Sequence, residues 1–516
     1  MEGYKKLLAS RLFDAVQQYY GYASYVLFRE SGEGFYCDYD ISPLTPEAFS
    51  EISKRVDASD INCAFELHSF SGVYEDGNAK NRMLQRIYVT AFATAAELSE
   101  YKSFVEEASK RDHKALGNEL KLFSSSSEIG QGLILWHPKG AMIRYLLESF
   151  GQKAHILNGY EWVYTPHIGR AELWKTSGHL DFYKDAMYSP MIIDQEEYYL
   201  KPMNCPFHIN IYNSEIHSYR DLPAKYAEYG TVYRYELSGA LNGLTRVRGF
   251  TQDDAHIICT PEQIEKEVAD ALKFSLYMLR SFGLNKFQAY ISTKPKEKFV
   301  GDIRDWEMAT EVLKRAVVSA GLEYEIDEGG GAFYGPKIDL KLFDSLNREW
   351  QCSTIQFDFN LPERFHMFYV GADGQHHTPY MVHRALFGSL ERFMALLIEQ
   401  YKGDFPFWFA PKQFGIVPVN EAHNNYAKRL SRELTAQGFR VSVNSGDDNM
   451  RNKIKRFQLE KVPYILVVGD REAASGTFAV RSRKDGDLGT MDIPSLQKHL
   501  KPQMDQGIPQ CIFEEE

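Results

Sequence analysis

The stretch YRYELSGALNGLTRVRGFTQDDAH, residues 233–256, decides how the middle of this chain folds. Two strand-like segments flank a loop that contains Gly and Ser, and their pairing places charged residues on one face of a sheet. Arginines hold phosphate oxygens through paired hydrogen bonds, while carboxylates hold Mg²⁺ or the amine and hydroxyls of a nucleotide. The pattern indicates a polyphosphate site, and the alternative is a solvated hairpin whose ion pairs contribute little. The residues concerned are Arg234, Glu236, Arg246, Gln252 and Asp254.

Two shorter stretches carry further candidates. In KPMNCPFH, residues 201–208, a Cys stands between prolines and near a His, which suits a metal ligand. Without a CxxC partner, Cys205 fits the description of a small buried apolar residue better. In HRALFGSLERF, residues 383–393, Arg392 is a charged residue in a largely apolar helix predicted over Met381–Gln400. It is either a phosphate-binding arginine or a partner in a structural salt bridge.

The pattern on either side of these stretches divides the chain into three regions. Residues 119–408 mix strands and helices in an irregular order, which favours a mostly antiparallel sheet and an α+β domain. Residues 409–516 read β-α-β-α-β, with strands predicted at Phe414–Val419, Arg440–Val443 and Tyr464–Val468. This order predicts a small α/β domain with parallel strands. Residues 1–118 predict a small α+β domain. It begins with a helix over residues 1–20 and ends with a charged, solvated linker helix over Glu97–Leu120.

Composition places the chain among packed globular proteins. Of its 516 residues, 44% are hydrophobic and 25% are charged, and no apolar run reaches the ~20 residues of a membrane span. Six cysteines in this length are not a disulfide framework, so we expect a reducing, cytoplasmic compartment. The formal net charge of −11 does not favour nucleic-acid binding, although an acidic enzyme can still have a basic groove.

Taken together, these stretches resemble the threonyl-tRNA synthetases, a family of class II aminoacyl-tRNA synthetases. The similarity runs from about Gly34 to about Leu500 and its motifs are long. Prolyl-, seryl- and glycyl-tRNA synthetases share the class II arginines but lack MNC, DDAH and VHRA together. The stretches that carry the resemblance are KPMNCPFH, TRVRGFTQDDAHI (245–257), GAFYGPKIDLKL (331–342), WQCSTIQFDF (350–359) and VHRALFGSLERF (382–393).

The resemblance implies a class II catalytic domain, a C-terminal anticodon-binding domain and a shortened editing domain at the N-terminus. It implies activation of threonine with ATP and Mg²⁺, transfer to tRNA(Thr), and a homodimer formed through motif 1, His137–Pro166. It assigns catalytic roles to Arg234, Arg392 and His179. The implied ATP-binding residues are Arg234, Glu236, Arg246, Gln351, Thr354 and Arg392. The implied threonine-binding residues are Met203, Gln252, Asp254, Tyr334, Lys337 and Gln356. The implied tRNA anticodon contacts are Arg451, Lys453, Glu472 and Arg481.

The resemblance also implies one Zn²⁺ per chain, held by Cys205, His256 and His383. These residues are 51 and 127 residues apart, so no local spacing rule identifies them. Valine has the shape of threonine but no hydroxyl, and a site that binds the hydroxyl can reject its absence by ~10⁴ or more. We therefore expect zinc to select the amino acid rather than to hydrolyse a bond.

The sequence departs from the family pattern in three places. We expect the usual N-terminal ubiquitin-like domain to be absent, and the region that resembles the editing domain does not match its paired-histidine helix or its Cys/His strand. We therefore expect no cis-editing of seryl-tRNA. Phe207 stands where the family has glycine. Within the hairpin 233–256, Arg234 and Glu236 resemble class II motif 2, and Tyr235 and Leu237 flank it where Asn or His and Pro are usual. A Phe at a Gly position either packs into the neighbouring core or narrows the pocket or the channel for the tRNA end.

Two other functions fit the domain pattern. One is a non-catalytic regulator that resembles a synthetase, but such relatives normally lose a motif arginine or a metal ligand, and here all are present. The other is amino-acid activation for a carrier other than tRNA, against which the anticodon-type domain argues.

Overall fold

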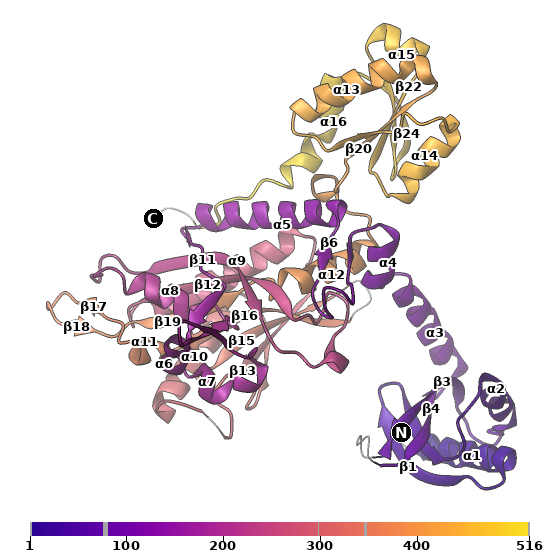
Figure 1. Cartoon of the computed structure of the whole chain (residues 1–516), viewed down its shortest axis with the longest axis horizontal. Coiled ribbons are helices and arrows are strands. Elements are labelled where there is room, and N and C mark those ends of the chain that lie inside the picture. The colour runs from indigo at the N-terminus through magenta and orange to yellow at the C-terminus, as the bar shows by residue number, and fades with distance from the viewer. Residues whose placement is uncertain (1–2, 76–80, 298, 345–347, 514–516) are drawn as a thin grey trace. The chain divides into compact units, whose positions relative to one another are not determined.

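The structure is a computed structural model that describes residues 3–75, 81–297, 299–344 and 348–513. The chain divides into two compact units, Met1–Ser109 and Lys110–Glu516 (Figure 1). The domain boundaries after residues 118 and 408 stay predictions.

The N-terminal unit is an antiparallel sheet with two helices on one face. Its strands lie in the order β1-β2-β4-β3, and α1 and α2 bury the apolar side of the sheet. Helix α1 forms where apolar residues recur at helical spacing, and Leu8, Leu12 and Val16 are fully buried. The elements are α1 (Gly3–Tyr20), β1 (Ser24–Ser31), β2 (Gly34–Asp40), α2 (Pro46–Arg55), β3 (Ala64–Tyr74), β4 (Met83–Phe92) and α3 (Ala95–Ser109).

The predicted linker helix over Glu97–Leu120 is not continuous. It is two helices, α3 and α4 (His113–Glu119), because the carboxylate of Asp112 accepts hydrogen bonds from the backbone N–H groups of Lys114 and Ala115. An aspartate in this position begins a new helix. The expectation of a solvated helix is also wrong for α4, since His113, Leu116 and Gly117 are buried.

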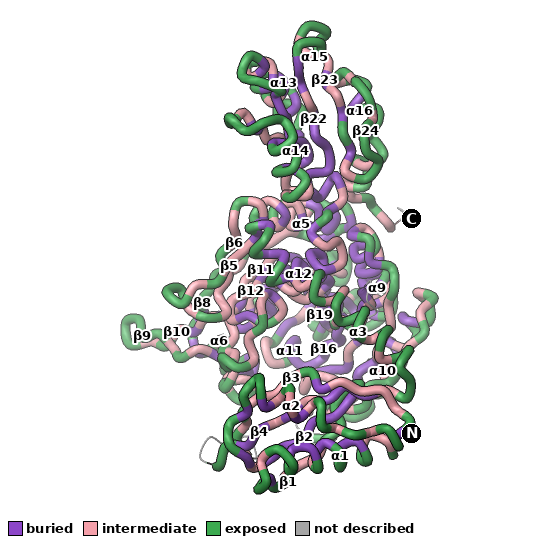
Figure 2. Tube along the Cα trace, turned by 90° about the vertical axis from the view of Figure 1, so that its right-hand side faces the viewer, coloured by how far each residue is buried: buried purple, intermediate pink, exposed green. Residues whose placement is uncertain are grey.

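The second unit contains a large sheet in the order β14-β13-β15-β16-β19-β12-β11-β7. Its pairs are antiparallel except for β13–β14 and β11–β7, so the predicted mostly antiparallel sheet is confirmed. Helices α5, α9 and α12 contribute to the main hydrophobic core, whose buried residues are drawn in purple in Figure 2. The strands are β7 (Glu161–Trp162), β11 (Ala224–Tyr233), β12 (Gly249–Cys259), β13 (Phe287–Ser292), β14 (Tyr324–Asp327), β15 (Lys337–Phe343), β16 (Glu349–Asp358) and β19 (Tyr380–Ala385).

Helices and short strands surround this sheet. The longer helices are α5 (Pro138–Leu157), α8 (Cys205–Tyr212), α9 (Ile264–Ser281), α10 (Ile303–Ser319) and α12 (Leu390–Tyr401). The shorter elements are β5 (Phe123–Ser124), β6 (Leu135–Trp136), β8 (Ile168–Arg170), α6 (Ala171–Thr176), α7 (His179–Phe182), β9 (Met191–Ile193), β10 (Glu196–Leu200), α11 (Leu361–Arg364), β17 (Tyr369–Val370) and β18 (His376–His377).

The helix predicted over Met381–Gln400 is wrong in its first half. Residues Tyr380–Ala385 form strand β19, which pairs with both β12 and β16. Helix α12 begins only after Ser389, whose hydroxyl accepts the backbone N–H of Arg392 at 3.1 Å. Neighbouring strands stabilise residues 380–385 as a strand, although the apolar residues further on fit a helical period.

The C-terminal region has the predicted parallel core. Strands β20 (Phe414–Pro418), β21 (Val441–Val443) and β22 (Tyr464–Val468) pair in parallel. Helices α13 (Asn424–Ala436) and α14 (Met450–Leu459) connect them. The sheet continues with antiparallel strands that the sequence analysis did not specify. The further elements are α15 (Asp470–Ser475), β23 (Phe478–Ser482), β24 (Gly486–Met491) and α16 (Ile493–Asp505).

The sequence predicted no membrane span and no disulfide framework. Within the described part of the chain, no helix has both the length and the apolar character that a membrane crossing requires. All six cysteines lie among the described residues, and each is a free thiol.

Candidate active site

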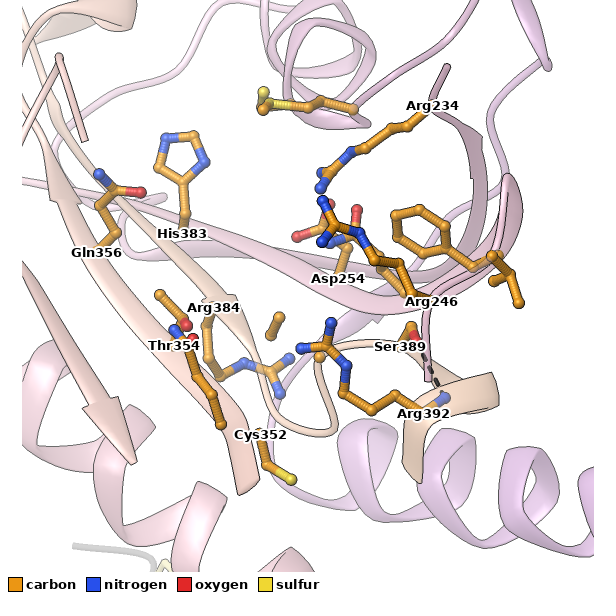
Figure 3. Close-up of a pocket in the computed structure, with 18 of the residues that line it drawn as sticks. Arg234, Arg246, Asp254, Cys352, Thr354, Gln356, His383, Arg384, Ser389 and Arg392 are labelled. Atoms are coloured by element: carbon orange, nitrogen blue, oxygen red, sulfur yellow. Dashed lines mark hydrogen bonds between the residues drawn. The ribbon is translucent and has the colours of Figure 1, made fainter. Parts of the chain in front are cut away.

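A cavity of about 390 Å³ lies over one face of the large sheet, which we call the active face. It lies between β12, β16, β19 and the start of α12. Figure 3 shows Arg234, Arg246 and Arg392 pointing toward one another from different elements, with His383 and Gln356 to one side. The structure therefore brings together most of the residues selected from the sequence. Those that line the cavity are Met203, Cys205, Arg234, Glu236, Arg246, Gln252, Asp254, His256, Tyr334, Gln351, Thr354, Gln356, His383 and Arg392.

The motif 2 hairpin positions two of the arginines. Arg234 directly follows β11, and its Nε donates to the carbonyl of Pro202 at 3.3 Å. Its guanidinium lies 5.0 Å from the ring centre of Phe250, a favourable cation–π contact that the sequence analysis missed. Arg246 lies in the loop before β12, where its Nε donates to Glu236 Oε2 at 2.9 Å. These contacts hold both guanidiniums at the cavity while leaving other N–H groups available.

The third arginine comes from the start of α12. Arg392 Nε donates to the carbonyl of Thr245 at 3.3 Å, so α12 and the motif 2 loop are joined at this point. Gly388 precedes the helix with φ +72°, and a Cβ there would lie 2.8 Å from the carbonyl oxygen of Cys352. Glycine is therefore required for the chain to turn into α12 beside β16.

At the other side of the cavity, one thiol and two imidazoles meet. The ligand atoms of Cys205, His256 and His383 all lie within 4.8 Å of one another. His256 and His383 are directly opposite each other on the antiparallel strands β12 and β19, and Cys205 is the first residue of α8. Strand register thus unites residues that are 127 positions apart in sequence.

The donor set fits Zn²⁺. His256 Nε2 and His383 Nδ1 are 3.0 Å apart. Two nitrogens bound tetrahedrally to one Zn²⁺ at about 2.05 Å would be about 3.3 Å apart. A thiolate with two imidazoles is a set that zinc prefers, and three protein ligands leave a position for substrate.

Each histidine of this set is oriented by a buried partner. His383 Nε2 donates to Asp358 Oδ2 at 2.7 Å, which leaves its Nδ1 lone pair for a metal. His256 Nδ1 lies 2.8 Å from His208 Nδ1, and His208 Nε2 lies 3.2 Å from Glu228 Oε1. Burial, together with the neighbouring His383 and His208, holds the pKa of His256 well below its usual value. A neutral imidazole is the form that binds metal.

The predicted threonine-binding carboxylate is also held in place. Asp254 Oδ2 accepts from the Nδ2 of Asn204 at 2.9 Å, and burial raises the pKa of Asp254 above its usual value. Sequence reasoning missed Asn204, His208 and Asp358. The first two lie in the quoted stretch 201–208 and the third in 350–359, but no spacing indicates what they contact.

Two predicted residues lie outside the cavity lining. His179 is buried, with Nδ1 2.7 Å from the hydroxyl of Ser177 and Nε2 3.0 Å from the sulfur of Met203, which itself lines the cavity. Lys337 lies on the active face of the sheet, but its ammonium donates to Asp339 Oδ2 at 2.6 Å. Asp339 in turn accepts from the Thr354 hydroxyl at 2.7 Å.

Phe207 packs into the neighbouring core rather than into the cavity. Its ring makes an edge contact with Trp174, at 5.8 Å between ring centres, and lies against Gly169, where a Cβ would meet it at 3.1 Å. Trp174 belongs to a small buried cluster against which Phe207 packs, and neither ring is among the residues that line the cavity. Tyr235 and Leu237, by contrast, are exposed in the motif 2 loop. Of the two readings of Phe207, the structure favours core packing.

The predicted anticodon contacts lie in the C-terminal region and differ in accessibility. Arg451 on α14 and Arg481 on β23 are exposed. Glu472 accepts the backbone N–H of Gly469 at 3.0 Å and so caps α15. Lys453 differs from expectation, because its side chain is buried and its ammonium donates to the carbonyl of Pro418 at 3.3 Å. A lysine buried in this way does not present its charge to an RNA backbone.

Comparison with known proteins identifies both regions of the second unit. Residues 188–401 match the "tRNA synthetase class II core domain (G, H, P, S and T)" and residues 413–503 match the "Anticodon binding domain". Fold and site together thus define a class II aminoacyl-tRNA synthetase.

The relatives narrow this class further. The chain is 52% identical over 438 residues to the threonine–tRNA ligase of Sulfurihydrogenibium sp. (strain YO3AOP1), covering 85% of this chain and 68% of the relative. It is 53% identical over 435 residues to the threonine–tRNA ligase of Borreliella afzelii (strain PKo), covering 84% of this chain and 75% of the relative. The chain therefore belongs to the threonine–tRNA ligase family.

Two solved structures are also similar to this chain. The crystal structure of the RNA binding domain of threonyl-tRNA synthetase from Cryptosporidium parvum Iowa II superposes with a TM-score of 0.74 at 39% identity. It covers 78% of this chain and 100% of that chain. A second structure, titled putative threonyl-tRNA synthetase ThrRS-1 from Aeropyrum pernix, gives a TM-score of 0.68 at 31% identity over 78% of this chain and 99% of that chain.

Proposed function

We propose that this enzyme uses ATP to activate L-threonine as threonyl-adenylate and transfers the threonyl group to tRNA(Thr), with Zn²⁺ selecting the amino acid. One observation carries the proposal. A single cavity joins three arginines at one end to a Cys/His/His set at the other. We call these the arginine end (Arg234, Arg246 and Arg392) and the metal end (Cys205, His256 and His383).

The arginine end suits the first reaction. A carboxylate oxygen of threonine attacks the α-phosphorus of ATP, a new P–O bond forms, and the bond to pyrophosphate breaks. Arg234 is placed to neutralise the α-phosphate and the attacking carboxylate, and Arg392 to hold the γ-phosphate with Arg246. Such in-line transfer depends mainly on position and charge neutralisation. Mg²⁺ enters with ATP. Glu236, Gln351 and Thr354 complete the proposed ATP site.

The metal end suits selection of the amino acid. When bound, Zn²⁺ supplies a Lewis-acid centre that distinguishes a β-hydroxy amino acid from its isostere valine. Cys205, His256 and His383 would hold the ion, and Asp254 would accept the hydrogen of the threonine hydroxyl. Asn204 keeps that carboxylate in position through its 2.9 Å hydrogen bond. Gln252, Gln356, Tyr334, Met203 and Lys337 are the other residues proposed to surround threonine.

The transfer step needs a base for the terminal ribose hydroxyl of tRNA. The ribose oxygen attacks the threonyl carbonyl, and AMP leaves with the electrons of the broken mixed-anhydride bond. We assign proton removal to His179, which contacts Met203 at the cavity wall. Burial lowers the pKa of His179 to about 4, so the imidazole is neutral and able to accept a proton.

Amino-acid-dependent exchange of pyrophosphate into ATP tests this function. We expect exchange with threonine, weaker exchange with serine, and exchange with valine lower by ~10⁴. Elemental analysis should find one zinc per chain, and purified tRNA(Thr) should accept threonine. Exchange with valine as fast as with threonine, or active protein without zinc, would contradict the proposal.

We further propose that the chain does not clear seryl-tRNA in cis. Ester hydrolysis needs a positioned base or nucleophile, and His68 is the sole histidine among residues 1–109. Its Nδ1 lies 3.1 Å from the hydroxyl of Thr90, and Cys37 is fully buried on the opposite side of the sheet. Incubation of seryl-tRNA(Thr) with the purified enzyme should release no serine beyond the spontaneous rate. Rapid release would show that editing is present.

The assembly is proposed to be a homodimer formed through motif 1. This segment, His137–Pro166, exposes the apolar side chains of Tyr145 and Tyr164, at 61% and 79% of their surface, and also Ile156 and Leu157. Apolar side chains gathered in one segment are typical of an interface. Light scattering should give twice the chain mass, and a monomer at micromolar concentration would contradict the proposal.

Contact with tRNA(Thr) is proposed through Arg451, Arg481 and Glu472 in the C-terminal region, with no such role for Lys453. We place the activity in the cytoplasm, because charged tRNA is used in translation and the free cysteines suit a reducing compartment.

A further inference from the structure

Helix α4 reaches the motif 2 loop through one buried histidine. His113 is 3% exposed, and its Nε2 accepts the backbone N–H of Leu244 at 3.1 Å. A backbone N–H can only donate, so Nε2 carries no proton and the hydrogen of the neutral ring is on Nδ1. That Nδ1 donates to Glu399 Oε1 at 2.7 Å, and the same oxygen accepts the backbone N–H of His113 at 3.1 Å. Both ring nitrogens are therefore committed to protein partners.

The residue that His113 contacts lies in the middle of a tight turn, residues 242–246. Asn242 and Arg246 exchange backbone hydrogen bonds of 3.1 and 3.2 Å, which closes the turn. Leu244 is fully buried in the main core. Arg246, the last residue of the turn, carries the guanidinium that faces the cavity, and the carbonyl of Thr245 accepts from Arg392. The position of this turn thus sets two residues of the arginine end.

These contacts also involve α12, the helix that carries Arg392. Arg392 and Glu399 are both on α12, two turns apart and therefore on the same side of the helix. Arg392 contacts the turn at Thr245, and Glu399 contacts it through His113 at Leu244. Arg348 forms an ion pair with Glu399 from the other side, so the carboxylate is fixed as well. The turn is held between two points of one rigid helix.

Gly243 independently indicates that the turn packs closely against His113. A Cβ at this position would lie 2.2 Å from His113 Nε2 and 2.9 Å from Lys114 Cγ, and φ is +48°. Real Cβ atoms do not approach so near, so only glycine lets the turn lie against the histidine ring. The cluster Asp112, His113 and Glu399 has the composition of a metal site. Both ring nitrogens of His113 are already hydrogen-bonded, so we assign the cluster to positioning the turn rather than to binding a metal.

We infer that His113 is a positioning residue for ATP binding, which fixes the turn 242–246 and through it Arg246 and Arg392. The inference rests on the proposed function for the role of the two arginines. It does not involve the metal end. Loss of the contact at Leu244 is therefore expected to affect ATP far more than threonine, zinc or the rejection of valine.

Two substitutions separate the two hydrogen bonds of the ring. In His113→Gln the amide reaches the position of Nε2, so its oxygen can still accept from Leu244. In His113→Asn the amide reaches only the position of Nδ1, so it can donate to Glu399 but cannot reach Leu244. We expect His113→Asn to raise the KM and Kd for ATP on the order of tenfold, the usual effect of leaving one buried donor unpaired. His113→Gln should restore most of the affinity.

Gly243→Ala tests the same turn without changing the histidine, and we expect it to weaken ATP binding at least as much as His113→Asn. It also serves if His113→Asn does not fold. His376→Asn, at an exposed histidine, is the matched control and should equal the wild type. Calorimetric titration with ATP gives Kd, exchange assays give the KM values for ATP and threonine, and thermal unfolding reports folding.

The outcomes distinguish this inference from the proposed function. Wild-type affinity for ATP in folded His113→Asn and Gly243→Ala would overturn the inference, as would equal loss in His113→Asn and His113→Gln. A parallel rise in the KM for threonine would show a general structural role instead. If the wild type exchanged pyrophosphate with no amino acid, the proposed function would fail, while the titration with ATP would still test the role of His113.

Discussion

The two ends of the cavity are built in different ways. At the metal end, Cys205, His256 and His383 come from the sheet and from the first residue of α8, and their partners are buried side chains. At the arginine end, the guanidiniums of Arg234 and Arg392 donate to backbone carbonyls. That of Arg246 forms an ion pair with Glu236, and Arg246 exposes 55% of its side chain. The metal end is thus held by buried side chains, whereas the arginine end is held by backbone carbonyls and by the turn that His113 contacts.

This difference matches the two tasks. In the proposed function, rejection of valine depends on one hydroxyl group, so the groups that contact this hydroxyl must not shift when it is absent. The phosphates of ATP, however, change partners and charge as pyrophosphate leaves. Arg234, Arg246 and Arg392 are each held through Nε, so their other N–H groups are available to the phosphate oxygens during that change.

Removal of Arg392 should have the largest effect. Arg392→Ala is expected to lower threonine-dependent pyrophosphate exchange by about 10³-fold, because one preorganised donor to the transition-state charge is lost. Arg392→Lys keeps the charge without the planar fork and should recover part of the rate. Steady-state exchange assays measure both. Arg451→Ala is the control, and an Arg392→Ala enzyme as active as this control would refute the assignment.

Removal of His208 tests how far the metal end depends on its buried partners. His208→Ala takes away the partner of His256 Nδ1, so the affinity for zinc should fall by about 10–100-fold. Competition with a chromogenic chelator measures this affinity without any assay of activity. His376→Ala, at an exposed histidine, should bind zinc as the wild type does. Unchanged affinity in His208→Ala would mean that the register of β12 and β19 suffices to orient His256.

Phe207→Ala should lower the stability of the protein without changing its selection of threonine. The ring packs on Trp174 and Gly169 and does not line the cavity, so its loss should lower the free energy of unfolding by about 2 kcal/mol, less than for a fully buried Phe. The KM for threonine should not change. Urea unfolding and exchange kinetics on the same preparation give both values. A large change in the KM for threonine with unchanged stability would place Phe207 at the pocket after all.

The smallest expected effect is that of pH on transfer. Since burial lowers the pKa of His179 to about 4, the ring stays neutral as pH falls from 8 to about 5.5. A histidine with an ordinary pKa of about 6.5 would be about nine-tenths protonated at pH 5.5. Single-turnover transfer from preformed adenylate should therefore be flat over this range, and a loss centred near pH 6.5 would contradict the assignment.

The same pKa shift has a consequence for stability. His179 binds a proton in the unfolded chain below about pH 6.5, but in the folded chain only below about pH 4. Its contribution therefore makes the folded state less stable as pH falls through that interval.

Much of the secondary structure could be predicted where it depends on local pattern. In the C-terminal region, the strands predicted at Phe414–Val419 and Tyr464–Val468 match β20 and β22 to within a residue. Each is a short apolar run, and two helices, α13 and α14, with strand β21 lie between them. The segment Met381–Gln400 failed because its apolar residues satisfy a helical period, while the pairing of residues 380–385 with β12 and β16 is invisible in the sequence.

The candidate site divides in a similar way. Stretch 233–256 indicated from its residues that arginines and carboxylates share one sheet face, and the structure places them at one cavity. The proposed zinc ligands came from family resemblance, since nothing in their spacing selects them. Their partners His208 and Asp358 were not predicted at all, and Lys453 was expected at the surface but is buried.

The sequence by itself determined the parallel core of the C-terminal region, the charged residues of the motif 2 hairpin and the family. The reason is that strand and helix periods and long motifs are local properties of the chain. Only the tertiary structure decided which imidazole nitrogens face one another, which carboxylate fixes each ring, and that α4 holds the turn 242–246. Those contacts join residues from 25 to 286 positions apart, and they exist only once sheet register and core packing bring the segments together.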